Sequence, residues 1–349
     1  PLLRNLFIQA QSPLAIASNV GALLYPITKA EYQAGSVPTP AQLFSHSDQS
    51  VVWQQTRADA PDRRGWGGRL ADMFYASNTN QQLSMNISID GENVFQAGDE
   101  VIPYFVGQGG AEGIWYVEPW QADRRAAFIA LRDAAHGNAL QRQFASVVRR
   151  SMNNQVMVNG ALEGETPLTT PFPDTHLGRQ LQMVARLIHV RNTLQMQRQI
   201  FFVGLGGFDT HDNQLADQAE QLTELDGALA AFYAATSEMG VANGVTTFTA
   251  SEFGRTTSIN GDGTDHGWGS HHLILGGAVN GRRIYGRPPD LSVGGPDDAD
   301  WGQIIPTTSV DQYAATIARW YGVSPGDMST VFPNIGRFAT PDLGFMGAP

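Results

Sequence analysis

A strand–helix–strand pattern near the middle of the chain restricts the fold more than any other feature of the sequence. An apolar run at residues 200–203 leads into a glycine-rich stretch, and a run rich in β-branched residues follows at 245–250. Between them, apolar residues recur at steps of three and four, as on one face of a helix: Leu215, Ala219, Leu222, Leu225, Leu229 and Phe232. The pattern predicts a βαβ unit with parallel strands and a right-handed crossover, and so an α/β fold.

Parallel strands joined in this way end at the same edge of a sheet, where open α/β folds bind their ligands. Polar residues follow both predicted strands and also occupy a loop shortly afterwards: Asp209 and His211, Ser251 and Glu252, and Asp265 and His266. We therefore expect three polar loops to converge on one active site.

Asp209 and His211 are two residues apart, so both side chains can face one ion. A carboxylate with an imidazole suits Zn, Mn or Fe. The alternative is that Asp209 only caps the following helix, which does not account for the histidine. Glu252 would add a carboxylate ligand, and Arg255 could hold an anionic substrate in bidentate fashion. An internal Glu252–Arg255 pair that organises the turn is the competing interpretation.

Asp265 and His266 lie between glycines in a predicted loop, where they could complete the metal site or act as acid and base. A hydrogen-bonded pair of structural value is the alternative. His271 and His272 are adjacent and would face opposite sides of a strand, so at most one could join the site.

Ser45 and His46 precede a helix that we predict to begin near Asp48. A serine at a helix N-terminus can serve as a nucleophile, with amides that bind an oxyanion. Capping of the helix is the more common reason for a serine there. The remaining histidines are interpreted as structural: His136, His176 and His189.

Charge and composition exclude several classes of function. The 349 residues carry a net charge of −11, and no Lys/Arg cluster exceeds a pair. The sequence therefore lacks the cluster of basic residues that is typical of a nucleic-acid-binding surface. An anionic substrate would need local cations or a metal. The absence of cysteine excludes disulfides, thiolate metal sites and cysteine nucleophiles. No run of 18 apolar residues predicts a transmembrane segment. A charged fraction of 16% with many glycine loops is compatible with a homo-oligomer.

The sequence predicts that the whole chain, 1–349, forms a single domain, with a β and helical insertion at roughly 80–198. The elements expected outside the central pattern are a strand at 14–21, a hairpin or small sheet within 80–118, helices at 121–157 and 177–196, a strand at 273–275 and a hairpin arm around 283–285. Ser309 and Gln312 form a capping box at the start of a last helix. The chain opens at Pro1 without a methionine, so we expect it to be processed or truncated.

Motifs spread over almost the whole chain resemble the bacterial family called domain of unknown function 1501. The matching stretches are Asn19–Gly21, Leu43–Gln49, Gly65–Arg69, Gly206–His211, Thr249–Thr256, Thr264–Gly269 and Pro306–Tyr313. Members of that family are usually exported by the twin-arginine route. The resemblance therefore implies a periplasmic or extracellular protein.

The family is grouped with the alkaline phosphatase-like superfamily. The resemblance implies a three-layer sandwich with a mainly parallel sheet flanked by helices and a small β-hairpin insertion. It also implies a two-metal centre, in which Asp209 and His211 match the first ligand pair and His266 the last. Ser251-Glu252 replaces an Asp-His pair of the relatives, which would alter the ligation there. Ser45 is the nearest match to the superfamily nucleophile.

One element of the family has no counterpart in the 349 residues. Its first strand ends in a Gly-Gly-Asn-Asp-like segment whose aspartate would bind metal, and we find no such segment within residues 1–349. The resemblance thus predicts either a fragment or processed chain, or an incomplete second metal site.

The function expected from residues and resemblance together is metal-dependent hydrolysis of phosphate or sulfate esters by an exported protein. The roles expected are one or two Zn, Mn or Fe ions on Asp209, His211, Glu252 and His266, catalysis by Ser45, His46, Asp265 and Arg255, and binding of a small anionic ester by Arg69 and Arg255. Asp265 is alternatively a partner of the ligands. The rival function is a non-catalytic exported binding or scaffold protein with a degenerate metal site. A phosphomutase is less expected, because exported proteins meet few sugar phosphates.

Overall fold

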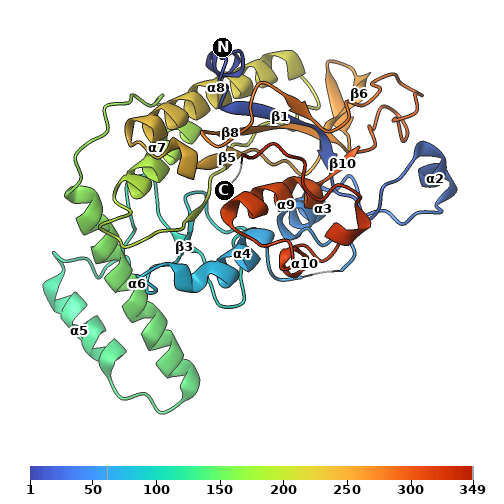
Figure 1. Cartoon of the computed structure of the whole chain (residues 1–349). Coiled ribbons are helices and arrows are strands. Elements are labelled where there is room, and N and C mark those ends of the chain that lie inside the picture. The colour runs from blue at the N-terminus through green and yellow to red at the C-terminus, as the bar shows by residue number, and fades with distance from the viewer. Residues whose placement is uncertain (61, 348–349) are drawn as a thin grey trace.

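The computed structural model describes residues 1–60 and 62–347, and its main sheet is mixed (Figure 1). The strands are β1 (Leu14–Gly21), β5 (Thr246–Phe248), β8 (Ser270–Gly276), β9 (Ile284–Tyr285) and β10 (Thr308–Ser309). They lie in the order β10-β1-β8-β5, with β9 also paired to β1. β1 runs parallel to β9 and β10, whereas β8 is antiparallel to both β1 and β5.

The expectation of a mainly parallel sheet is therefore wrong for the main sheet. Between β5 and β8 lies a hairpin and no crossover helix. A parallel neighbour needs such a crossover, so β8 starts near the edge where β5 ends and runs back. The predicted hairpin arm at residues 283–285 is also wrong, because β9 pairs in parallel with β1.

A second, three-stranded sheet is parallel throughout. It contains β2 (Asn86–Ser88), β3 (Tyr104–Phe105) and β4 (Ile200–Phe202), in the order β3-β2-β4. Residues 80–118 thus contribute to a small sheet, one of the two forms expected, and not to a hairpin. The predicted unit of β4, α8 (Gln214–Glu238) and β5 is present in sequence, but β4 and β5 belong to different sheets and are not hydrogen-bonded neighbours.

Helices cover both faces of the main sheet. Alternate residues of its strands point to opposite sides, and apolar side chains are buried on each side. Leu14 and Leu275 pack with α1 (Leu2–Phe7), α7 (His176–His189) and α8. Ala15 and Ile274 face the other core cluster, with α3 (His46–Gln55), α4 (Trp66–Phe74), α9 (Val310–Tyr321) and α10 (Met328–Val331). Figure 1 shows α7 and α8 on one side of the sheet and α9, α3 and α4 on the other.

Local signals in the sequence place several of these helices. The capping box at Ser309 and Gln312 is present at the start of α9, as predicted. The helix expected at 177–196 ends earlier, at His189. The remaining short elements are α2 (Lys29–Ala34) and the 3-10 turns at Tyr75–Ser77, Ala242–Gly244 and Ile335–Arg337.

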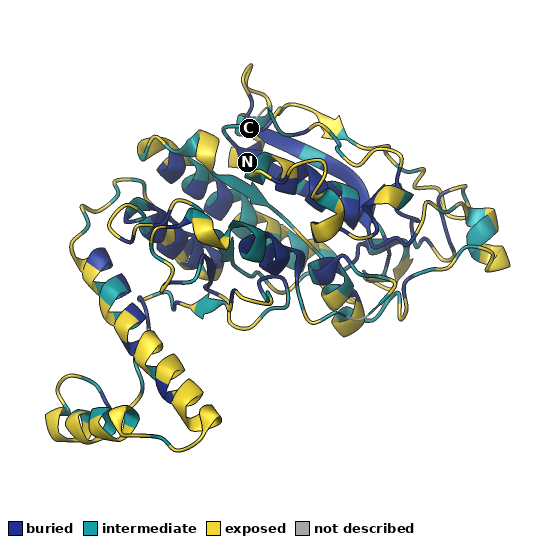
Figure 2. Ribbon diagram, turned by 60° about the horizontal axis from the view of Figure 1, so that its bottom comes forward, coloured by how far each residue is buried: buried dark blue, intermediate teal, exposed yellow. Residues whose placement is uncertain are grey.

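An arm of two helices projects from the body of the molecule (Figures 1 and 2). The single helix expected at 121–157 is in fact two, α5 (Ala122–Asp133) and α6 (Ala139–Glu163). The break is stabilised by Asn138, whose side chain accepts a hydrogen bond from Gln141 N at 2.8 Å and so caps α6. Much of the arm is exposed, including Leu140 and Phe144 at 83% and 71%. Among the described residues, no helix has the length and apolar character needed to cross a membrane.

An antiparallel hairpin extends from the main sheet towards the loop after β4. It consists of β6 (Arg255–Asn260) and β7 (Gly263–His266). Asp265 and His266 therefore lie on a strand, although we predicted a loop from the flanking glycines. Gly263 packs so closely on the backbone of His211 that an added Cβ would lie 2.2 Å from its carbonyl carbon. This contact fixes the hairpin against the loop that carries Asp209.

Candidate functional site

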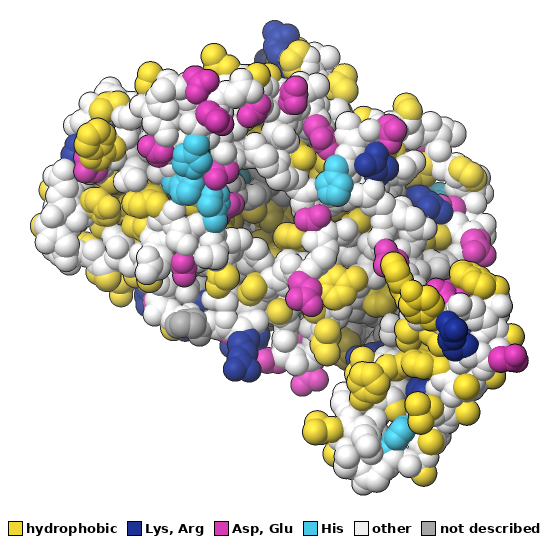
Figure 3. Space-filling model, turned by 180° about the vertical axis from the view of Figure 1, so that it is seen from behind, with side chains coloured by type: hydrophobic (Ala, Val, Ile, Leu, Met, Phe, Trp, Pro, Cys, Tyr) yellow, Lys and Arg dark blue, Asp and Glu magenta, His cyan; other side chains and the backbone are white. Residues whose placement is uncertain are grey.

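Four elements bring a group of histidines and carboxylates to one rim of the molecule. Asp209 and His211 come from the loop after β4, and Glu252 follows β5. His46 is the first residue of α3, and His266 is the last residue of β7. Figure 3 shows histidine and carboxylate side chains gathered on one face beside a hollow with hydrophobic walls. The three predicted loops thus meet, with α3 as a fourth contributor.

Asp209 is the centre of this group. Its Oδ1 lies 2.9 Å from His211 Nε2, 3.0 Å from His266 Nε2 and 2.6 Å from Arg255 Nη1. Its Oδ2 lies 3.1 Å from His46 Nε2. Burial raises the pKa of Asp209, but hydrogen bonds from Arg255 and His46 and the nearby histidines outweigh it and lower the pKa to about 2. Asp209 is therefore a carboxylate at neutral pH.

Each of the three histidines is held by its other ring nitrogen, Nδ1. His46 Nδ1 lies 2.6 Å from Glu252 Oε1, and His211 Nδ1 lies 3.2 Å from Asp265 Oδ1. The third, His266 Nδ1, lies 2.8 Å from the carbonyl oxygen of Phe44. These oxygens accept hydrogen bonds, so each Nδ1 carries the proton. In a neutral ring the Nε2 lone pair is then directed towards Asp209.

This arrangement differs in one respect from the expected ligand set. Glu252 contacts the outer nitrogen of His46 and not the centre of the group, where it was expected as a ligand. The hydrogen bond from His46 to Glu252 and the one to Asp209 raise the pKa of His46, although burial opposes them. Asp265 also accepts a hydrogen bond from Asn260 Nδ2 at 2.6 Å. Both carboxylates therefore orient imidazoles.

The inner atoms suit a transition-metal ion. Ligand atoms of His46, Asp209 and His266 all lie within 4.8 Å of one another. His211 Nε2 is 3.1 Å from His266 Nε2, a separation close to that of neighbouring ligands on an ion with bonds of about 2.0–2.1 Å. His46 Nε2 is shielded from solvent, and the polar atom that it faces is Asp209 Oδ2 at 3.1 Å. Metal-binding histidines generally donate their other nitrogen to a carboxylate or carbonyl, as these do.

Arg255 is part of the site but is already engaged. Besides Asp209, its guanidinium contacts Thr264, with Nε 3.1 Å from the hydroxyl oxygen and Nη2 bonded to the carbonyl. Among the described residues it forms no ion pair with Glu252, so the alternative of an internal Glu252–Arg255 pair is not what organises this turn. Arg255 joins β6 and β7 to Asp209.

Ser45 lies next to His46, where α3 begins. Its side chain does not cap the helix. The hydroxyl donates to Asp48 Oδ2 at 2.6 Å. Among the described residues no hydrogen bond joins Ser45 to Asp209 or to the three histidines.

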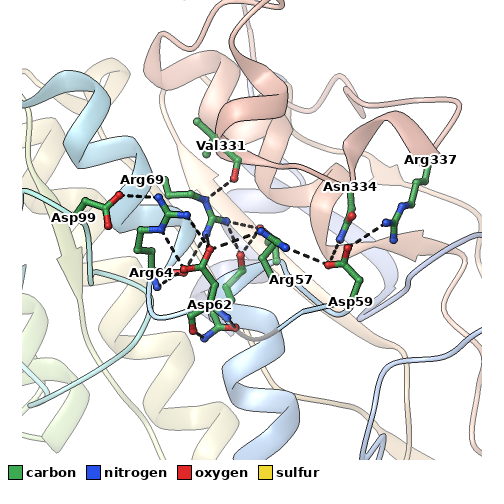
Figure 4. Close-up of polar contacts among 11 residues, drawn as sticks. Arg57, Asp59, Asp62, Arg64, Arg69, Asp99, Val331, Asn334 and Arg337 are labelled. Atoms are coloured by element: carbon green, nitrogen blue, oxygen red, sulfur yellow. Dashed lines mark hydrogen bonds and ion pairs between the residues drawn. The ribbon is translucent and has the colours of Figure 1, made fainter.

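Arg69 is not brought to the site. It is buried in α4, and its guanidinium donates to the carbonyl oxygens of Val331 and Arg64 at 2.7 and 3.0 Å and to Thr56 Oγ1 at 2.9 Å (Figure 4). Burial lowers its pKa to about 10. Its donors serve main-chain carbonyls, so we do not retain it as a substrate-binding residue.

Neither of the adjacent histidines in β8 joins the group. His272 is buried, with Nε2 2.8 Å from Ser270 Oγ, and burial lowers its pKa to about 3. His271 Nδ1 accepts from the backbone amide of Asn19 at 3.2 Å.

Two contributors to the site escaped the sequence analysis. The ring of Phe253 lies 4.4 Å from His266 and 4.7 Å from His46, between centroids, and so packs against both imidazoles. The carbonyl of Phe44 orients His266. The sequence gives no signal for either residue beyond its position next to Glu252 or Ser45. Any residue can supply a backbone carbonyl, and many can supply a packing contact.

Comparison with known proteins gives one result. No curated protein and no solved structure matches the chain. The model of the family described as "Protein of unknown function (DUF1501)" matches residues 10–323, which is most of the 349 residues. The chain therefore belongs to the DUF1501 family.

Proposed function

We propose that this protein is an exported, metal-dependent hydrolase of phosphate or sulfate esters. The observation that carries the proposal is the orientation of His46, His211 and His266. Each ring is held at Nδ1 by an acceptor, and each presents Nε2 to Asp209 at about 3 Å. When the three rings are neutral, their Nε2 lone pairs all face one negatively charged carboxylate. A divalent cation would remove this conflict.

The donor set indicates which ion fits. Three nitrogen atoms and one carboxylate oxygen suit Zn, Mn or Fe better than Mg or Ca, which prefer oxygen ligands. A bound ion of this kind would polarise an ester oxygen and lower the pKa of a bound water to about 7. Asp209, His46, His211 and His266 would hold it. Glu252, Asp265 and Phe44 O would keep the three imidazoles in the binding tautomer.

Arg255 and Ser45 are the residues that would act on the substrate. Arg255 places a positive charge next to Asp209, and in a protein with a net charge of −11 such a local cation attracts an anionic ester. Ser45 remains the candidate nucleophile. Its hydroxyl already donates to Asp48 at 2.6 Å, so that carboxylate can take the proton when Ser45 attacks the phosphorus or sulfur atom and the bond to the ester's alkoxide breaks.

A second candidate function is a non-catalytic exported binding protein. The projecting arm favours it, because Leu131, Leu140 and Phe144 are 70%, 83% and 71% exposed. Exposed large apolar side chains are typical of surfaces that bind other proteins. The metal centre would then be structural.

Elemental analysis of the purified protein tests the first proposal. We expect about one equivalent of transition metal or more, lost in Asp209→Ala and retained in Asp99→Ala, which removes an exposed carboxylate paired with Arg64. Hydrolysis of 4-nitrophenyl phosphate and sulfate should follow the metal content. Protein that stays metal-free after incubation with Zn, Mn and Fe would contradict the metal centre. Metal without hydrolysis of either ester would favour the binding protein.

A further inference from the structure

The outer part of the projecting arm differs from the rest of the chain in charge. We call residues 122–153 the outer arm; it comprises α5, the turn after it and the first part of α6. It contains six arginines and two acidic residues, a net charge of +4, whereas the whole chain carries −11 and the other residues together therefore carry −15. A cationic segment thus projects from a strongly acidic body (Figure 1).

One face of α6 is buried at its C-terminal end and bare at its N-terminal end. Residues four and three apart lie on the same face of a helix, and this face contains Leu140, Phe144, Val147, Ser151, Asn154 and Val158. Val158 is buried in the core cluster that includes α7 and α8. Leu140 and Phe144, in contrast, are among the most exposed large apolar residues of the described chain. The face that packs on the body therefore continues, without cover, along the outer arm.

Arginines stand beside the exposed apolar side chains. Leu131 on α5 is exposed, and Arg124 lies seven residues before it, which is the same side of the helix. On α6, exposed Arg150 follows Val147 by three positions. Figure 3 shows the arm with hydrophobic side chains over much of its surface and Lys or Arg side chains among them.

The loop before α5 adds aromatic side chains to this region. Trp115, Tyr116 and Trp120 are all exposed. The guanidinium carbon of Arg124 lies 5.8 Å from the ring centroid of Tyr116, which places this loop beside the first turn of α5. Trp and Tyr rings combine an apolar body with a polar tip and are enriched where a membrane meets water.

Large apolar side chains next to arginines require a partner that is both apolar and anionic. The surface of an anionic phospholipid bilayer offers acyl chains beneath phosphate headgroups, and helices of this composition bind there. A nucleic acid would neutralise the arginines but leave Leu140 and Phe144 in water. Contact between the outer arms of two copies would bring together segments of like charge.

The projection of the arm suits a surface that would repel the acidic body. Asn154 Nδ2 donates to the carbonyl oxygen of Gln82 at 3.1 Å, so α6 contacts the body at that point. The fifteen residues of α6 before it, from Ala139 to Asn153, extend about 22 Å at 1.5 Å per residue. Electrostatic repulsion is screened over about 8–10 Å at physiological salt. The turn between α5 and α6 can therefore touch an anionic surface while the body stays beyond the range of repulsion.

We propose that the outer arm is a peripheral binding element for anionic phospholipid bilayers. Leu131, Leu140 and Phe144 insert at the level where headgroups meet acyl chains, and Arg142 and Arg150 contact lipid phosphates. The two contributions are both required, since the apolar surface is small and the arginines alone are screened by salt. The proposal does not depend on the candidate metal centre.

The test is co-sedimentation of the full chain with vesicles. One set consists of phosphatidylcholine alone and the other contains about 30% phosphatidylglycerol, which gives the surface a negative potential. We expect binding to the anionic vesicles in about 0.1 M NaCl, and binding weaker by about tenfold or more in about 0.5 M NaCl. Vesicles of phosphatidylcholine alone should bind as weakly as the anionic vesicles do at high salt.

Two double variants separate the apolar and cationic contributions. Leu140→Ser together with Phe144→Ser should lower the partition coefficient for anionic vesicles by about tenfold or more, because it removes the inserted side chains. Arg142→Glu together with Arg150→Glu should lower it by about 25-fold or more, since each basic residue near such a surface strengthens binding by about fivefold. All four positions are exposed, so circular dichroism should show folded proteins.

Matched changes on the body serve as controls. Ile102→Ser together with Val293→Ser removes two exposed apolar side chains, and Arg4→Glu together with Arg63→Glu reverses two exposed charges. Both should bind the anionic vesicles as the parent does.

Three results would overturn the proposal. The first is equal binding of the parent and both outer-arm variants to anionic vesicles, and the second is no binding of the parent to either vesicle at the lower salt concentration. The third comes from sedimentation velocity without lipid. A dimer of the parent that Leu140→Ser with Phe144→Ser abolishes, without binding to vesicles, would assign the outer arm to contact between two copies.

Discussion

Glu252 Oε1 lies 2.6 Å from His46 Nδ1, so this carboxylate holds the ring by the nitrogen that faces away from Asp209. The contact joins the end of β5 to the start of α3, two segments that are about 200 residues apart in sequence. It sets the tautomer of His46 and leaves Nε2 available to an ion.

Replacement of Glu252 should therefore weaken metal binding without abolishing it. We expect Glu252→Gln to raise the dissociation constant for Zn by about 10–100-fold, the usual effect of losing a partner of a ligating histidine. Competition with a chelating dye measures it. Glu220→Gln, the same change at an exposed position of α8, should bind as the parent does. An effect of Glu220→Gln as large as that of Glu252→Gln would argue against the assigned role.

Arg255 should matter more for the reaction than for the fold. Arg255→Ala removes the cation beside Asp209, so kcat/KM for an anionic ester should fall by about 100-fold, or about 3 kcal/mol of transition-state stabilisation. Arg255→Lys keeps the charge but not the forked geometry, so its kcat/KM should lie between those of the parent and Arg255→Ala. Steady-state kinetics on 4-nitrophenyl phosphate, with metal content measured in parallel, checks the order. Equal loss of metal and activity in both variants would instead assign Arg255 to the metal centre.

Asp311 gives the protein a stability that decreases with rising pH. It is fully buried near the start of α9, and burial raises its pKa to about 7, although a hydrogen bond from Ser309 opposes the shift. The folded state therefore holds the proton more tightly than the unfolded state does. Its contribution to the unfolding free energy is complete below pH 4 and is lost as the pH rises to about 7.

Asp311→Asn should abolish this dependence. At pH 8 the variant should be more stable than the parent, by about 4 kcal/mol at most, because one pKa unit corresponds to about 1.4 kcal/mol. Urea unfolding at pH 5 and pH 8 measures the difference. The control is Asp327→Asn, which alters an exposed carboxylate that accepts from Ser324. If Asp311→Asn were less stable than the parent by the same amount at pH 5 and pH 8, the prediction would be contradicted.

His272 acts in the opposite direction. Burial lowers its pKa to about 3, so the folded state resists protonation while the unfolded state accepts it near pH 6.5. Its contribution to stability is present above pH 6.5 and is lost as the pH falls towards 3. As the pH is lowered from 6.5 to 4, the unfolding free energy of His272→Gln should fall less than that of the parent. Thermal melts across this range test it, with the exposed His176→Gln as the matched variant that should behave as the parent does.

Elements set by local sequence were predictable. The strand at Leu14–Gly21, the capping box at Ser309 and the apolar steps that form α8 depend on neighbouring residues, and all three are present. The meeting of Asp209, His211, Glu252 and His266 was also expected, the first three because they follow two predicted strands and His266 as part of a predicted loop, although it lies on β7. Whether these residues bind a metal stays a prediction.

The features that the sequence did not reveal depend on contacts between distant segments. Strand direction is decided by pairing, so nothing local to β8 distinguishes antiparallel from parallel. Arg69 comes directly after Gly67 and Gly68 in the sequence, and its hydrogen bond to the carbonyl of Val331, 262 residues away, shows that its guanidinium is structural. Glu252 was assigned to the metal because its partner, His46, comes from a helix in another part of the chain.

The projecting arm has a consequence of scale. α6 has 25 residues, which at 1.5 Å per residue gives a rod about 37 Å long. Leu140 and Phe144 stand in its first turns, next to the break after α5 and remote from the main sheet. A partner bound at this tip would lie far from the main sheet. Such binding would leave the rim at Asp209 accessible to solvent.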